Sequence, residues 1–242
     1  MRFLVFSDIH GNIDALERVL EEAARLRPDM IVSLGDVVGY GANPNECIAL
    51  VQEAAHIRIG GNHDVAAAGI IGTETFNGTA RKAIQWTSRA IHPRNRDALG
   101  EYDTVRRYAE CVFAHASPVS PMEWEYVYTI NQANALFTKT PEKFIFIGHT
   151  HVPAIIEHTG ARGSRVVPGT FSPVASGSRY LVNVGSIGQP RDGVAAASFV
   201  LLDMKKGTIT IRRVPYDIRS AQEKIRNVGL PESLAERLAT AR

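Results

Sequence analysis

Five short apolar runs in this 242-residue chain each end in polar side chains of the kinds that bind metal ions. The runs have the length and composition of buried strands, and each one delivers its polar residues into the loop that follows. Loops at strand ends are common places for a binding site to assemble. The polar side chains are Asp8 and His10, then Asp36, then Asn62 and His63, then His115, and finally His149 and His151.

The composition is that of an ordinary globular protein. With 45% hydrophobic and 21% charged residues, a chain of this length can bury a large core. The formal net charge is +2 and there is no Lys/Arg block, so we expect no extended nucleic-acid binding, although a nucleotide-sized substrate remains compatible. Cys47 and Cys111 lack the spacing of a disulfide framework or a thiolate zinc site.

No apolar run approaches the ~18 residues of a membrane-spanning helix. The first residues, RFLVFSDIHG, contain acidic and imidazole side chains where a signal peptide would continue apolar. We therefore expect a cytoplasmic protein without membrane contact. The sequence leaves the oligomeric state open, and a homo-oligomer is compatible with it.

The first third of the chain alternates strands with helices. Apolar residues at three- and four-residue spacing predict an amphipathic helix over 14–26, and a second helix is expected over 44–55. Strands before, between and after these helices predict a parallel sheet. Residues 65–102 depart from this pattern and contain one clear helix around 77–90. Because this segment directly follows GNHD, it is either a lid or wall of the site or a pair of helices that only cover the sheet.

The second half begins with predicted strands over 104–110 and 110–116, a surface loop over 117–128 and a helix over 131–139. The next strand ends at His151. Beyond it, short strands separated by Gly-rich turns predict antiparallel hairpins. Residues 220–242 form an amphipathic helix with a break at 229–231 in this interpretation. We expect one domain over 1–242, with 65–102 as a helical insertion that is a candidate cover of the site.

A site of carboxylate, imidazole and amide ligands without cysteine suits divalent metals such as Mn, Fe, Zn, Ni, Co or Mg. Residues two apart in an extended segment point the same way, so Asp8 with His10, and His149 with His151, are expected to face one site. The full set exceeds the needs of one ion and predicts two. Two cations ~3.5–4 Å apart can hold a bridging hydroxide and neutralise phosphoryl oxygens, which favours phosphate ester hydrolysis. Close backbone approach at such a site is expected at Gly35, Gly60, Gly61 and Gly148.

In chain order, the motifs DxH, GDxxxxG, GNHD, a lone His after a strand, and GHTH resemble those of the calcineurin-like metallophosphoesterase family over residues 8–192. The loop NVGSIGQPRDG resembles that of its small prokaryotic phosphodiesterase branch. The resemblance implies an α/β fold, a four-layer α/β/β/α sandwich of two mixed sheets flanked by helices. It also implies a metal-dependent phosphoesterase, in the first place a phosphodiesterase that hydrolyses small phosphate esters or nucleotides.

The same resemblance implies a role for each motif residue. His63 would not bind metal but would protonate the leaving oxygen or stabilise the transition state, which makes His63 and the bridging Asp36 the catalytic residues. Asn62 and Arg191 are the candidate substrate ligands, and Arg191 either binds phosphate or only holds its loop. The implied metal ligands are Asp8, His10 and His151 for one ion, Asn62, His115 and His149 for the other, and Asp36 between them.

One departure from the family concerns Gly39 and Tyr40, where the protein Ser/Thr phosphatase branch has Asp-Arg. The carboxylate that would orient His63 and the guanidinium that would clamp phosphate are both missing at these positions. This weighs against a protein phosphatase, which stays an alternative. Asp64 could orient His63 from another direction, but a capping role at the following helix is favoured.

A second alternative is a non-catalytic scaffold or regulatory protein, because the family resemblance extends to a retromer trafficking subunit without evident catalysis. The complete ligand set of this chain argues against it.

Among the aromatic residues, Tyr40 is expected to be a buried plug rather than a substrate contact. Trp86 and Trp124 are expected to be packing residues, although either could stack on a nucleobase if its segment folds over the site.

Overall fold

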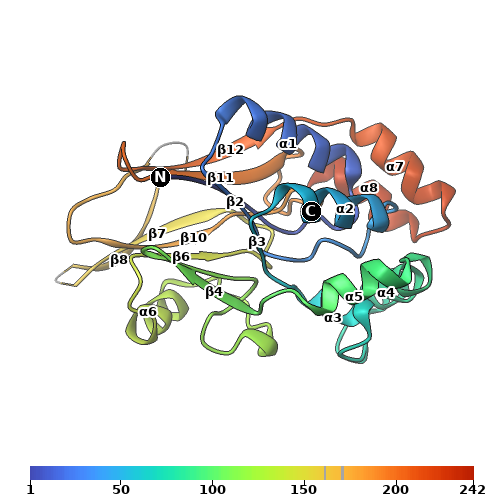
Figure 1. Cartoon of the computed structure of the whole chain (residues 1–242), viewed down its shortest axis with the longest axis horizontal. Coiled ribbons are helices and arrows are strands. Elements are labelled where there is room, and N and C mark those ends of the chain that lie inside the picture. Colours follow the sequence, from blue (N-terminus) through green and yellow to red (C-terminus); the bar gives the residue numbers. More distant parts are fainter. Residues whose placement is uncertain (161, 170–171) are drawn as a thin grey trace.

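The computed structural model describes residues 1–160, 162–169 and 172–242, and within them two six-stranded sheets pack face to face (Figure 1). In the first sheet, three parallel strands from the N-terminal third are extended by antiparallel strands from the C-terminal part. The predicted parallel start is confirmed. The strand order is β3 (Ile57–Arg58), β2 (Met30–Ser33), β1 (Arg2–Phe6), β11 (Ala197–Asp203), β12 (Thr208–Val214) and β9 (Ser172–Pro173).

The second sheet is also mixed. Its strand order is β4 (Val105–Tyr108), β5 (Cys111–Ala114), β6 (Phe144–Ile147), β10 (Arg179–Asn183), β7 (Ala154–Thr159) and β8 (Gly163–Val167). The predicted antiparallel hairpins are confirmed for β7 with β8 and for β11 with β12. For β10 the prediction was incomplete, because this strand lies between β7 and β6 and runs parallel to β6. Such pairing joins distant parts of the chain, and turn signals do not report it.

Alternating side chains create the layers. In β1, Phe3 and Val5 point between the sheets, whereas Leu4 and Phe6 point to the helices outside. Figure 1 shows α1 (Ile13–Leu26), α2 (Pro44–Ala54), α7 (Ile218–Asn227) and α8 (Glu232–Thr240) on one side and α6 (Ile130–Lys139) on the other. The outer face of the second sheet packs against α6. The predicted four-layer α/β/β/α sandwich is confirmed.

Residues 62–100 contain three helices, α3 (Asn62–Ala68), α4 (Gly78–Ala90) and α5 (Pro93–Gly100), where one was clearly predicted. The short α3 begins inside the GNHD motif, and α5 begins at a proline, whose fixed φ suits a first helical position. Both are too short for a clear periodic pattern. The helices α4 and α5 pack against α2.

The C-terminal segment forms α7 and α8, separated at the predicted break. The first of these begins at Ile218, earlier than predicted, because the Asp217 side chain accepts a hydrogen bond from the Ser220 backbone N–H and caps the helix. The loop predicted over 117–128 includes one 3-10 turn, Pro121–Glu123. None of the described helices is long and apolar enough to cross a membrane. Cys47 and Cys111 are buried free thiols.

The packing between the sheets generates a stability prediction. Phe146 is fully buried there, and its ring stacks on Phe113 with centroids 5.4 Å apart. Phe146→Ala should lower the free energy of unfolding by about 3–5 kcal/mol, because it leaves a cavity that the sheets cannot close. Equilibrium denaturation followed by circular dichroism measures this. Val166→Ala, at a side chain that is 61% exposed, should change stability by less than about 0.5 kcal/mol. Equal effects of the two changes would contradict this account of the core.

Candidate metal centre

The predicted ligands converge at the carboxyl ends of parallel strands from both sheets. Asp8 follows β1, Asp36 follows β2, His115 follows β5 and His149 follows β6. The structure places the predicted carboxylate and imidazole ligands in three overlapping groups with ligand atoms within 4.8 Å of one another, and His63 joins one of them. All are buried. The groups are Asp8, His10 and His151; His10, Asp36 and His63; and Asp36, His115 and His149.

The backbone at the ligands is not extended, so the predicted reason for their common direction was wrong. Asp8, His10, Asp36, His149 and His151 lie beyond the strand ends with φ between 51° and 65°, in the left-handed region. Residues other than glycine are strained in this region, and such strain persists only where surrounding contacts hold the backbone in place. Here the N–H groups of Asp8 and His10 donate to the carbonyls of Gly35 and Asp36, both at 2.9 Å. Turns therefore aim the paired ligands at one point.

Three imidazoles are oriented by backbone carbonyls that the sequence did not reveal. The Nδ1–H of His10 donates to the Val38 carbonyl (3.1 Å), that of His115 to Leu34 (2.9 Å) and that of His151 to Gln189 (2.6 Å). These bonds orient the rings so that Nε2 of each one faces the centre. The only sequence signal was the resemblance of the 183–193 loop, which contains Gln189.

Imidazole nitrogens face each other in pairs at short range. His10 Nε2 and His151 Nε2 are 3.1 Å apart, and His115 Nε2 lies 3.0 Å from His149 Nδ1. Burial lowers the pKa of both His10 and His151, so these rings are neutral and their facing nitrogens are both acceptors. Two acceptors repel unless a cation lies between them. The spacing suits adjacent ligands of one ion with bonds of about 2.0–2.1 Å.

The carboxylates supply the charge for such ions. Oδ2 of Asp36 lies 3.6 Å from His10 Nε2 and 3.4 Å from His115 Nε2, so one oxygen faces both halves of the centre. Burial opposes ionisation of Asp8, but His151 and His115 outweigh it and hold its pKa below the usual range. Burial would lower the pKa of His115, yet Asp36 raises it to about 9. The centre is therefore an electrostatic site for cations.

Buried atoms at the centre also lack protein partners. Among the described residues, Asp8 Oδ1 and Asn62 Oδ1 accept no hydrogen bond of normal geometry, although Asp8 Oδ1 lies 3.2 Å from His151 Nε2. An unsatisfied buried acceptor costs about 1–3 kcal/mol. Mixed carboxylate, amide and imidazole donors fit divalent metals that accept oxygen and nitrogen. The residues present therefore fit a metal centre.

The surroundings of His63 leave no room at position 39 for a carboxylate beside its Nδ1. Its Nδ1 has no hydrogen-bond partner within the described parts of the chain. A Cβ atom added to Gly39, which has φ of +90°, would lie 2.3 Å from this nitrogen, so no side chain fits there. Burial lowers the pKa of His63 to about 4, against the influence of Asp36. His63 is thus a neutral imidazole.

Asp64 does not orient His63. It is the third residue of α3, and its carboxylate accepts hydrogen bonds from the N–H groups of Gly61 and Val38, both at 3.1 Å. The favoured capping role is correct in kind, but Asp64 caps from inside the helix rather than as the residue before it. Burial and the nearby Asp36 raise its pKa to about 7.

A cavity of about 610 Å³ opens beside Asn62, His63 and His149. Its walls come from residues 71–77, in the segment predicted as a lid or wall, and from residues 122–126 of the predicted surface loop. The lining aromatic residues are Tyr40, Phe76, Trp124 and Tyr126.

Tyr40 is buried, as predicted, and also lines this cavity. Trp86 packs on the core, whereas Trp124 lines the cavity. Phe76 and Tyr126 were not singled out in the sequence; an aromatic-rich WEYVY stretch was the available signal for the second.

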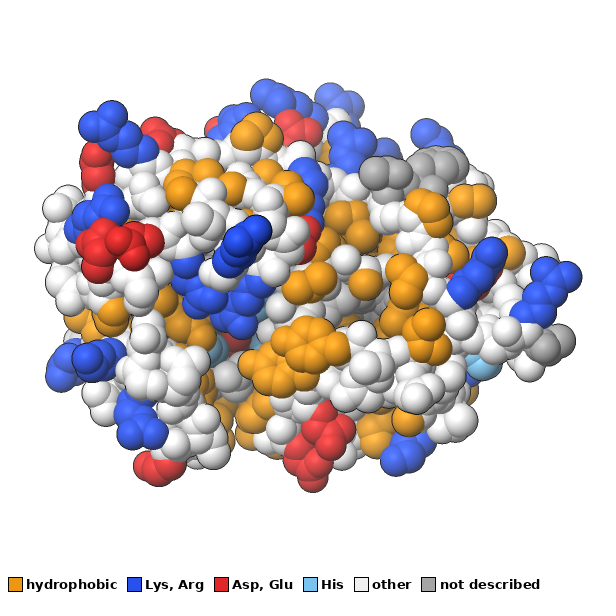
Figure 2. Space-filling view, turned by 180° about the vertical axis from the view of Figure 1, so that it is seen from behind, with side chains coloured by type: hydrophobic (Ala, Val, Ile, Leu, Met, Phe, Trp, Pro, Cys, Tyr) orange, Lys and Arg blue, Asp and Glu red, His pale blue; other side chains and the backbone are white. Residues whose placement is uncertain are grey.

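Arg191 lies at the edge of the same site. Its backbone N–H donates to the His151 carbonyl at 3.2 Å, and its guanidinium lies 5.9 Å from the centroid of the Tyr40 ring. It also donates to the Gln189 side chain at 3.0 Å, so it both holds its loop and faces the centre. Figure 2 shows Lys and Arg side chains gathered on one side of a hollow that contains histidine and acidic groups, with hydrophobic side chains on the other side.

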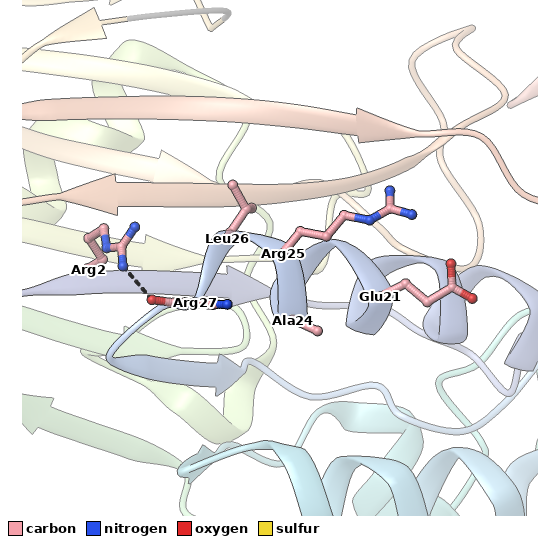
Figure 3. A pocket seen from close by; sticks show the side chains of 6 residues that line it. All are labelled: Arg2, Glu21, Ala24, Arg25, Leu26 and Arg27. Atoms are coloured by element: carbon pink, nitrogen blue, oxygen red, sulfur yellow. Dashed lines mark hydrogen bonds between the residues drawn. The ribbon is translucent and has the colours of Figure 1, made fainter.

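A second hollow, of about 760 Å³, lies at the C-terminal end of α1 and is shown in Figure 3. Arg2 donates there to the Arg27 carbonyl at 2.6 Å. Its lining contains none of the predicted site residues. It is therefore separate from the candidate centre.

Comparison with known proteins gives consistent results. Residues 1–207 match the model of the calcineurin-like phosphoesterase superfamily domain. An uncharacterized protein of Methanocaldococcus jannaschii is 37% identical over 242 residues, covering 98% of this chain and 97% of that protein. The crystal structure of a metallophosphoesterase from Sphaerobacter thermophilus is 39% identical, with a TM-score of 0.88, and covers 100% of this chain and 99% of that one. Serine/threonine-protein phosphatase 1 of Salmonella typhimurium is 28% identical over 141 residues, 53% of this chain and 65% of that protein.

Glycines at the centre generate the next prediction. An added Cβ would collide with neighbouring atoms at Gly35, Gly61 and Gly148, as predicted, whereas at Gly60 its nearest neighbour lies at an ordinary 3.5 Å. At Gly148 it would lie 2.2 Å from Ser7 Oγ and 2.6 Å from Asp8 Oδ2. Gly148→Ala should therefore displace Asp8 and weaken Mn²⁺ binding by about 10–100-fold, measured by calorimetric titration.

The matched control is Gly78→Ala at the start of α4, where an added Cβ meets no described atom within 4 Å. Its Mn²⁺ affinity should equal that of the unmodified chain. Unchanged affinity in Gly148→Ala would show that the close approach at Asp8 is not needed for binding.

Proposed function

Because the chain belongs to the calcineurin-like phosphoesterase superfamily, we propose that it is a dinuclear metal-dependent phosphodiesterase that hydrolyses small phosphate esters or nucleotides. The observation that carries this proposal is the position of Asp36, whose Oδ2 faces His10 on one side and His115 on the other. One oxygen in that position suits a ligand shared by two ions. A single-ion site would not need imidazoles on both sides.

In this proposal each half of the centre holds one divalent ion. When bound, two such ions activate water and neutralise the charge on phosphoryl oxygens. The donor set accepts Mn, Fe, Zn, Ni, Co or Mg, so availability and affinity together decide the species. The proposed ligands are Asp8, His10 and His151 on one side, Asn62, His115 and His149 on the other, and Asp36 between them.

His63 and Arg191 act on the substrate in this proposal. His63 lines the cavity beside the centre, and as a neutral imidazole it can donate a ring N–H to the leaving oxygen as charge develops there. The Arg191 guanidinium, near the Tyr40 ring, binds a phosphate oxygen by a charge-assisted hydrogen bond. Asn62 is both a proposed metal ligand and a proposed substrate ligand.

The similarity to a serine/threonine-protein phosphatase supports the alternative of a phosphoprotein substrate. The space at Gly39 weighs against it, because no side chain fits beside His63 Nδ1. A non-catalytic scaffold is the other alternative, and the convergence of the carboxylate and imidazole groups weighs against it. We propose further that residues 1–242 form one cytoplasmic domain in which 65–102 supplies a wall of the site. The free buried thiols support the cytoplasmic assignment. The packing of α7 on α1 supports a single domain, because it joins the two ends of the chain.

Two substitutions separate metal binding from the proposed chemistry. Asp36→Asn should lose both bound Mn²⁺ and hydrolysis of bis(p-nitrophenyl) phosphate, because the shared ligand loses its charge. His63→Gln should keep the metal but lower kcat by about 10²–10³-fold. Metal content by mass spectrometry and steady-state rates measure these effects. His92→Gln, at an exposed histidine outside the motifs, should leave both unchanged. Loss of metal in His63→Gln would contradict its proposed role.

A substrate panel tests the reaction class. The protein loaded in turn with Mn, Ni, Co, Zn and Mg should hydrolyse bis(p-nitrophenyl) phosphate faster than p-nitrophenyl phosphate or a phosphoserine peptide. Preference for the peptide would favour the phosphatase alternative. No turnover of any ester with any metal would favour the scaffold.

A further inference from the structure

We propose that the cavity beside His63 binds the base of a nucleoside, so that the substrate is a phosphodiester with a nucleoside leaving group rather than a polyphosphate. This inference rests on the proposed function, which places the phosphate at the metal centre and the leaving group beside His63. The cavity itself is formed by the protein chain alone.

The cavity has room for a nucleoside, and part of its wall is aromatic. Its volume of about 610 Å³ is within the usual range for a small-molecule site. Phe76 meets His63 edge-on at 5.0 Å, and Trp124 meets His115 edge-on at 6.0 Å. Tyr126 stacks on His149 at 4.1 Å. Aromatic rings that line the cavity thus contact His63, His115 and His149.

Part of this aromatic and apolar surface is exposed. Tyr126 and the neighbouring Met122 are each 43% exposed, and both line the cavity. Exposed apolar surface within a concave site marks a place where a ligand gains free energy by covering it. Tyr126 already stacks on His149 and Tyr128, so the ring assigned to stack on the base is Trp124. A base stacked there would cover apolar surface at little cost in side-chain entropy, since aromatic residues have few rotatable bonds.

The charge in the cavity selects against a chain of phosphates. Glu74 and Glu123 belong to the lining, and none of the described lining residues is Lys or Arg. Carboxylates repel phosphate groups but accept hydrogen bonds from the amino groups of bases. The guanidinium groups lie elsewhere: Arg191 is near Tyr40, and the half-buried Arg237 of α8 lies close enough for its charge to act on Arg191. The site therefore separates an anion-binding side from an aromatic side.

The two tryptophans of the chain make a direct binding test practicable. In Trp86→Phe, Trp124 is the sole tryptophan, and its fluorescence should change saturably on addition of adenosine 5′-monophosphate. Ribose 5-phosphate has the same phosphate but no base. It should bind at least about 10-fold more weakly, because stacking on one base contributes about 1–3 kcal/mol.

Trp124→Leu tests the contact in the otherwise unmodified chain. Calorimetric affinity for adenosine 5′-monophosphate should fall by about 10-fold or more, while affinity for ribose 5-phosphate stays within about twofold. Equal loss for both ligands, or no loss for the nucleotide, would overturn the inference. Faster turnover of diadenosine tetraphosphate than of a dinucleoside monophosphate would also overturn it.

These readouts separate this inference from the proposed function. Base-dependent binding without hydrolysis of any diester would leave the cavity assignment intact and refute the phosphodiesterase. Hydrolysis of aryl diesters without base-dependent binding would do the reverse.

Discussion

Two buried carboxylates, Asp8 and Asp36, are surrounded by imidazoles where the strand ends of both sheets meet. Removing two like charges from water is costly unless positive charge or hydrogen-bond donors compensate for it. The protein supplies backbone donors to one oxygen of each carboxylate, from His149 to Asp8 and from His63 to Asp36. The remaining oxygens face imidazole nitrogens. A bound cation would complete this balance, and the loops around the centre hold the carboxylates and imidazoles in place for it.

The left-handed turns at the ligands follow from the same constraint. In an extended segment, two ligands that are two residues apart would point the same way without converging. The left-handed turns after β1 and β6 instead bring the two ligands of each pair toward one point. These turns are held by hydrogen bonds between loops, and the 186–191 loop takes part: Ser186 Oγ donates to the Asp8 carbonyl at 2.7 Å, and Gln189 orients His151. The strain of the turns is thus supported by segments distant in the sequence.

Apolar patterning predicted most strands, and metal-binding side chains marked the residues that gather at the centre, because both are local features. The layers of the sandwich were implied by the family resemblance. The sequence did not predict that β10 runs parallel to β6, since strand pairing joins distant residues. The carbonyls of Leu34, Val38 and Gln189 also escaped prediction, because any residue type can supply a carbonyl. The cavity walls form only when residues 71–77 and 122–126 fold together.

Because His63 Nδ1 has no carboxylate partner among the described residues, other contacts must orient this ring. In the described structure, three rings surround it: Tyr40 at 4.6 Å, His10 at 4.8 Å and Phe76 at 5.0 Å between centroids. Packing against rings fixes the imidazole and buries it, and this burial lowers the pKa of His63. A carboxylate partner would instead favour the imidazolium. The aromatic residues therefore have two connected effects: they form the cavity wall, and they keep His63 neutral and in place, so a change in the wall also changes the environment of the proposed catalytic ring.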